Sequence, residues 1–255
     1  VRVLLNNEVL TTVDGVLTPE QDIQINTANT EFQGNISAGA AVQLVKTGSG
    51  TLTVGGALTA DWLEIDEGTL RLSSQGNTIN TLHGDGALAL EGAMELDGNA
   101  TAFEGALSGS GALILNGVMN GAGSIGSLSG NGELRASGST FTVQNLRESS
   151  FSGSLADGSG SGTLVVENGG ARFSLNQVQS TQAWSLENRG NTTFVQSGAG
   201  DNSVLTLDSL RLLDGSDSVF VFDTDKNAQV FNLNNLLVQD GASVTLQSSG
   251  SLPVS

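Results

Sequence analysis

The chain has 255 residues, of which 38% are hydrophobic and 14% charged, with 35 Gly, no Cys and a formal net charge of -17. The hydrophobic content excludes a disordered acidic tail, and no apolar run approaches the roughly 18 residues that span a bilayer. Because only 9 residues are Lys or Arg, nucleic acid is excluded as a partner, and the lack of Cys excludes disulfides, thiolate zinc sites and cysteine nucleophiles.

Short strands are predicted along the whole chain. Apolar residues recur at every second position, and Gly interrupts nearly every window long enough for three helical turns. Six segments share the form Gly-x-Leu-x-apolar, in which a turn residue leads into a strand whose alternate side chains share one face. They begin at Gly50, Gly68, Gly86, Gly111, Gly132 and Gly162.

The C-terminal half carries a related repeat that ends in an Asn or Asp turn. The aligned segments are 166–169, 186–188, 212–215 and 238–241. Asp-Gly also closes two-residue hairpins, which would give an up-and-down antiparallel sheet. The spacing of about 18 to 30 residues, with one turn signature per repeat, favours stacked coils instead.

We therefore predict an all-β fold, a single-stranded parallel β-helix of roughly twelve coils. Residues 1–255 are expected to form one continuous solenoid with no separate catalytic domain. The central leucines of the six repeats should point into one shared core, namely Leu52, Leu70, Leu88, Leu113, Leu134 and Leu164.

Two groups of segments resemble a known family. Residues 44–54 and 63–72 resemble the passenger-associated repeat of bacterial autotransporters. The segments that start at Phe32, Phe103 and Phe151 are similar to the Phe-x-Gly-x-apolar phrase that often precedes this repeat. The resemblance implies a right-handed helix, type V secretion through a C-terminal β-barrel, and display outside a Gram-negative cell.

Catalytic patterns are scarce in the sequence. His83 is the single histidine, so any Ser-His-Asp site would need it, and its Gly-bounded surroundings predict a solvated turn residue. The Gly-Asp-Ser-Gly nucleophile phrase of protease autotransporters is missing. We therefore expect no enzyme and no catalytic residue.

Acidic residues are densest between positions 208 and 225, at Asp208, Asp214, Asp217, Asp223 and Asp225. Carboxylates on adjacent coils can activate water or bind Ca²⁺ in polysaccharide-acting β-helices. Residues 223–227 begin like a calcium loop, but Ala228 stands where the sharp turn needs Gly. Solvated carboxylates explain this pattern better, and we expect no metal and no cofactor.

Aromatic side chains suggest contact positions. Trp62 precedes the inward pair Leu63 and Ile65, so parity directs it outward, whereas Trp184 is expected to pack. In the run 219–222 two valines alternate with Phe220 and Phe222, so one pair must face out. The candidate binding residues are Trp62, Asp208, Asp217, Phe220, Phe222, Asp223 and Asp225.

The expected function is that of an adhesin passenger domain on the bacterial surface. An acidic solenoid with Asn, Thr and Asp along its faces can bind through many weak polar contacts. The expected partner is a host-cell surface, an extracellular-matrix component, or the same protein on a neighbouring cell, with membrane attachment only through the absent barrel. The alternatives are a passive stalk and, third, a polysaccharide-acting enzyme.

Overall fold

The computed structural model describes residues 2–5, 11–13, 15–96, 102–115, 124–136, 138–157, 162–176, 178–180, 184–195, 204–222 and 230–248. The chain divides into two compact units, Val1–Gly126 and Ser127–Ser255. Strands and turns make up the described part, which contains no helix and therefore no helix that could cross a membrane. The fold class is all-β, as predicted.

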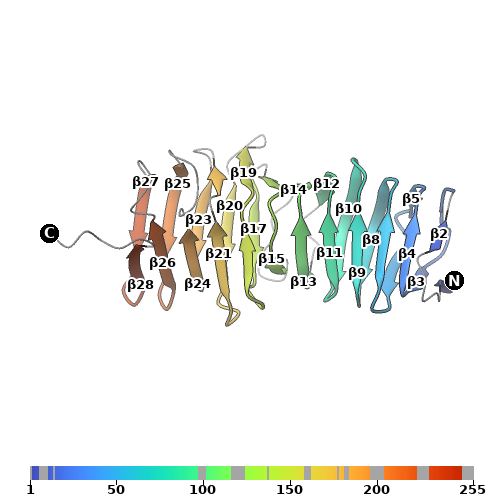
Figure 1. Ribbon diagram of the computed structural model, residues 1–255, viewed down its shortest axis with the longest axis horizontal. Coiled ribbons are helices and arrows are strands. Elements are labelled where there is room, and N and C mark those ends of the chain that lie inside the picture. The colour runs from blue at the N-terminus through green and yellow to red at the C-terminus, as the bar shows by residue number, and fades with distance from the viewer. Residues whose placement is uncertain are drawn as a thin grey trace. The chain divides into compact units, whose positions relative to one another are not determined.

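The first unit holds the strands up to β14, and β15 lies where the two units join in sequence (Figure 1). Their bounds are β1 Arg2–Leu5, β2 Thr11–Val13, β3 Ile23–Thr27, β4 Asn29–Phe32, β5 Ile36–Ser37, β6 Gln43–Thr47, β7 Thr51–Val54, β8 Leu58–Ile65, β9 Thr69–Leu72, β10 Asn77–Gly84, β11 Ala87–Leu90, β12 Met94–Leu96, β13 Ala102–Gly109, β14 Ala112–Leu115 and β15 Ile125–Leu128.

The second unit holds the remaining strands. Their bounds are β16 Glu133–Ala136, β17 Thr140–Val143, β18 Ser149–Phe151, β19 Ser154–Asp157, β20 Thr163–Val166, β21 Arg172–Asn176, β22 Gln179–Ser180, β23 Ser185–Asn188, β24 Asn191–Val195, β25 Val204–Leu212, β26 Asp217–Phe222, β27 Val230–Val238 and β28 Ser243–Ser248.

The strands stack in parallel as a β-solenoid. Every strand pairing defined for the described residues is parallel. In the first unit, for example, β4, β7, β9, β11 and β13 follow one another in register. The parallel solenoid is thus confirmed and the hairpin alternative is wrong. The expected count of roughly twelve coils is not confirmed.

The repeat leucines lie in the core, in several ladders. All six are at most 3% exposed. Leu52, Leu70 and Leu88 occupy successive positions of one ladder, which continues to Leu107. Leu113 instead stacks on Met94 in a second ladder of the first unit. In the second unit Leu134 stacks on Leu155, and Leu164 lies between Phe141 and Leu186.

The Asp-Gly pairs form corners between two stacks. Gly215 and Gly241 have φ angles of 74° and 87°, a conformation that favours glycine. Each turn is closed by a backbone hydrogen bond, from Ser216 N to Leu213 O at 3.0 Å and from Ala242 N to Gln239 O at 3.1 Å. Because β25 and β27 precede these turns and β26 and β28 follow them, the chain changes sheets at Asp-Gly and does not reverse on itself.

Lys46 is an inward-facing residue in the first unit. It occupies the ladder between Ile25 and Ile65 and is 1% exposed. Its Nζ donates to three corner carbonyls, Thr47 O at 3.1 Å, Gly48 O at 2.7 Å and Glu67 O at 2.8 Å. These bonds join consecutive coils and offset part of the cost of burying the charge. Burial nevertheless lowers the pKa of Lys46 to about 8.

Leu88 is fully buried between Leu70 and Leu107, so its truncation should destabilise the fold. Leu88→Ala should lower the free energy of unfolding by about 2 to 5 kcal/mol, because the coils on either side prevent the cavity from closing. Thr53→Ala, on the outward side of β7, is the control and should change it by less than about 0.5 kcal/mol. Denaturant unfolding measures both, and a Leu88→Ala loss as small as the control's would place Leu88 outside the core.

The buried lysine predicts an unusual alkaline pH dependence. The folded pKa of about 8 lies below the ordinary 10.5, so between these values the unfolded chain binds more protons and stability rises with pH. Relative to Lys46→Met, the wild-type free energy of unfolding should rise by up to about 3 kcal/mol from pH 7.5 to pH 10.5. A flat or falling difference would contradict the buried ammonium.

Candidate functional site

The second unit presents a surface with few charged residues on the sheet of β18, β21, β24, β26 and β28. We call its outward positions the lateral face: Ser150, Arg172, Ser174, Asn176, Asn191, Thr193, Val195, Asp217, Val219, Val221, Ser243, Thr245 and Gln247. All of them are partly or well exposed. One Arg and one Asp are the charged members, so the face is neutral in a chain whose net charge is -17.

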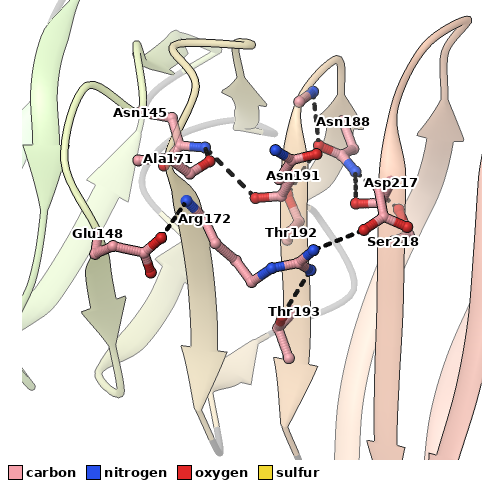
Figure 2. A network of polar contacts seen from close by, with 11 residues as sticks. Asn145, Glu148, Ala171, Arg172, Asn188, Asn191, Thr192, Thr193, Asp217 and Ser218 are labelled. Carbon is pink, nitrogen blue, oxygen red and sulfur yellow. Dashed lines mark hydrogen bonds and ion pairs between the residues drawn. The ribbon is translucent and has the colours of Figure 1, made fainter.

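An ion pair between Arg172 in β21 and Asp217 in β26 spans the lateral face. Arg172 Nη2 lies 2.6 Å from Asp217 Oδ2, and Nη1 donates to Thr193 Oγ1 at 3.1 Å (Figure 2). The Arg172 backbone N–H donates to Glu148 Oε1 at 3.2 Å. Since about a third of each ion-pair side chain is exposed, the pair contributes little stability. It joins the first and third strands of the β21–β24–β26 stack across the lateral face.

Beneath the lateral face lies a buried polar network that the sequence patterns did not indicate. Asn188 occupies the ladder position between Val166 and Leu212. The alignment of the C-terminal repeats had put Leu186 at this position, two residues too early. Its Oδ1 accepts from Gly190 N at 3.1 Å and Thr192 Oγ1 at 2.8 Å (Figure 2). Its Nδ2 donates to Ser218 Oγ at 2.8 Å. The network fixes the corner that leads into β24.

A second outward feature, in the first unit, is a stack of two aromatic rings. Trp62 in β8 and His83 in β10 have ring centroids 4.1 Å apart and planes 18° apart. The outward direction expected for Trp62 fits its position next to buried Leu63. His83 was expected in a solvated turn, and this is wrong, because it lies in a strand and packs on Trp62. Within the described residues, Trp62 Nε1 and His83 Nε2 are buried atoms without a hydrogen-bond partner.

Three carboxylates, Glu64, Asp66 and Asp85, lie close to His83 in the sequence or in strand register. Glu64 pairs in register with His83. Burial raises the pKa of Asp66, and the charge and hydrogen bond of Glu64 and the charge of Asp85 add to the increase. Burial also lowers the pKa of His83. No group of three metal-ligating side chains occurs among the residues that the structure places.

The acidic residues singled out in the sequence do not form one site. Asp208 is exposed in β25 and accepts from Asn234 Nδ2 at 3.3 Å, whereas Asp217 belongs to the other sheet and pairs with Arg172. Asp223 and Asp225 lie outside the described residues. Of the candidate acids that the structure describes, Asp217 lies in the lateral face and Asp208 does not.

In the run 219–222 the valines face outward and Phe220 faces the core. Phe220 is 7% exposed and stacks on Phe194 with ring centroids 4.5 Å apart. Val219 and Val221 are the outward pair, and Phe220 packs on the inner side of β26. Phe222 ends β26, and its side chain lies outside what is described. Trp184 packs as expected, with 0% exposure and Nε1 donating to Ala156 O at 2.9 Å.

Comparisons with known proteins do not assign the chain to a family. No family model, no curated protein and no solved structure matches it. The autotransporter resemblance therefore rests on the sequence phrases alone.

The buried network makes Asn188 a stabilising residue. Asn188→Ala should lower the free energy of unfolding by about 2 to 4 kcal/mol, because the Gly190 N–H and the two hydroxyls lose their partner in the core. Asn176→Ala, on the outward side of β21, is the matched control and should cost less than about 1 kcal/mol. Equal effects of the two substitutions in denaturant unfolding would contradict the network.

The single histidine allows a direct titration. Since burial lowers its pKa, the NMR midpoint of the His83 imidazole should fall below the ordinary 6.5. The unfolded chain then binds more protons at acid pH, so stability should fall as pH drops below 6.5. His83→Phe, which keeps a ring on Trp62, should remove this part of the pH dependence, and a midpoint above 6.5 would contradict the packing.

Proposed function

We propose that the chain is an adhesin segment that binds through the lateral face of its second unit. The observation that carries this proposal is a neutral face of parallel Ser, Thr, Asn and Val positions in a strongly acidic chain. A partner that approaches it avoids the repulsion of the acidic surfaces and meets regularly spaced hydroxyl and amide groups. The partner is a surface of similar chemistry, either the same protein on a neighbouring cell or a host matrix component.

The location is also a proposal. The passenger-like phrases support export to the surface of a Gram-negative cell, with attachment through a barrel encoded outside residues 1–255. A passive stalk is the alternative function, and a polysaccharide-acting enzyme is third.

We also infer the finer architecture, a right-handed β-helix of roughly twelve coils. Register partners in the described strands are 18 residues apart at Leu52 and Leu70 and 26 apart at Leu210 and Leu236. Steps of this size divide 255 residues into about twelve coils. Right-handed crossovers between parallel strands are the strong rule in proteins. An experimental structure with a left-handed crossover, or with far fewer coils, would contradict this.

Bead aggregation and binding to immobilised matrix proteins test the adhesin proposal. Val219→Asp introduces charge into the lateral face, and Thr163→Asp introduces the same charge on the outward side of β20 in the other sheet. Val219→Asp should weaken binding at least about tenfold, and Thr163→Asp should change it less than about twofold.

Salt separates the two kinds of partner. Contact between copies should strengthen as salt screens the net charge of -17, whereas a basic host ligand should dissociate as salt rises. If both Asp substitutions weakened binding equally, the proposal that the lateral face is the binding surface would be contradicted. Absence of any aggregation or matrix binding would favour the stalk.

A further inference from the structure

The corner between β20 and β21 contains Asn168 followed by Gly169. The chain has four Asn-Gly pairs, and the structure describes two of them, at Asn168 and at Asn131. In such a pair the amide nitrogen of the glycine can attack the side-chain carbonyl carbon of the asparagine, because glycine has no side chain to hinder the approach. In a folded protein the rate of this attack depends on how freely the backbone at the pair can move.

The backbone of this corner, residues 168–170, is free to move. All three residues are exposed, and none of the backbone hydrogen bonds between described residues involves them. The flanking bonds lie just outside the corner, from Glu167 N to Val143 O at 2.9 Å and from Ala171 N to Asn145 O at 3.2 Å. Residues 168–170 can therefore change conformation without breaking a backbone hydrogen bond.

The other described pair, Asn131-Gly132, is held in place. Gly130 O accepts from Ser152 N at 2.8 Å, and Gly132 O accepts from Ser154 N at 3.0 Å. The attack requires rotation of the backbone between these two anchored carbonyls, so the corner has to open first, which lowers the rate. The same dipeptide is therefore expected to react at different rates in the two corners.

Close stacking of corners requires the glycine that follows Asn168. A Cβ atom added at Gly169 would lie 2.1 Å from Gln144 O and 2.6 Å from Asn145 O, in the corner of the preceding coil. Any other residue at this position would collide with that backbone. The reactive pair is thus a consequence of the fold once asparagine stands at position 168.

We propose that Asn168 is a site of spontaneous deamidation in the folded protein. The Gly169 amide loses its proton to hydroxide, its nitrogen forms a bond to Asn168 Cγ, and the Cγ–Nδ2 bond breaks with release of ammonia. Water then opens the cyclic imide at one of its two carbonyls, which gives either Asp or isoaspartate. Both products add one negative charge to the chain, next in sequence to Glu167, which forms an ion pair with Arg189 at 2.8 Å.

Peptide mapping by mass spectrometry tests the site after incubation of the folded wild-type chain at neutral and mildly alkaline pH. Trypsin releases residues 148–172, in which Asn168 has the only side-chain amide, so a mass gain in this peptide reports its conversion. Asp157 also precedes a glycine in this peptide, but its conversion to isoaspartate does not change the mass. Digestion in heavy-oxygen water marks any conversion that occurs during digestion itself.

The structure predicts a difference between the two described asparagines. In the folded chain Asn168 should convert at least about fivefold faster than Asn131, because the corner of Asn131 has to open first. In urea the two rates should become similar, since both are then Asn-Gly pairs in an unfolded chain. The rate at Asn168 should rise with pH, because the attack needs the deprotonated Gly169 amide.

Asn168→Gln is the control variant, and it should lose the mass gain because glutamine has to close a larger, less favourable ring. The proposal is overturned by an unchanged mass of peptide 148–172 from the folded chain, or by equal rates at Asn168 and Asn131 before unfolding. A rate ratio that persists in urea, a rate at Asn168 that does not depend on pH, or a mass gain that remains in Asn168→Gln would also overturn it.

Discussion

Parallel pairing of each coil on the one before it is the constraint on which the rest of the structure depends. In this arrangement an inward residue always has the residue of the preceding coil beside it, so inward positions form continuous ladders. A change of register by one residue would turn a whole ladder outward. The apolar ladder through Leu52, Leu70 and Leu88 shows the simplest solution. A second solution is a polar ladder residue whose side chain bonds the groups of a corner.

Lys46 and Asn188 illustrate this second solution. Lys46 donates to corner carbonyls of consecutive coils, and Asn188 bonds a corner N–H and two hydroxyls. Asn77 in β10 does the same, since its side chain accepts from Leu58 N and donates to Ala93 O. In each case the side chain replaces bonds that a corner cannot make with its own backbone. Buried polar residues here stabilise the turns and leave the outer faces free for other roles.

The fold could be predicted from the sequence because its signal is local and repeated. Alternating apolar residues indicated strands, and one turn signature per repeat indicated coils in place of hairpins. Which leucines share a ladder could not be predicted, because Leu113 has the same Gly-x-Leu-x-apolar pattern as Leu88 and yet stacks on Met94 in another ladder. The alignment also missed Asn188, since a ladder position occupied by a polar residue carries no hydrophobic signal.

The candidate site was less predictable than the fold. The alternation of inward and outward residues predicted that Trp62 points outward. It could not predict that His83 of the next coil stacks on Trp62. The density of acids between 208 and 225 suggested a site, although Asp208 and Asp217 belong to different sheets. The lateral face depends on which residues become neighbours across coils, and this is set by coil lengths that sequence spacing defines only approximately.

Disulfide trapping of stacked positions tests the central claim most directly. Thr51 and Thr69 are register partners on the outer face, as are Thr53 and Arg71, and the chain has no Cys of its own. Cysteines at either pair should form a disulfide on mild oxidation, because both pairs are adjacent in parallel strands. Cysteines at Thr53 and Ala89, two coils apart, should not. Trapping at only one of the two adjacent pairs would indicate antiparallel strands and contradict the solenoid.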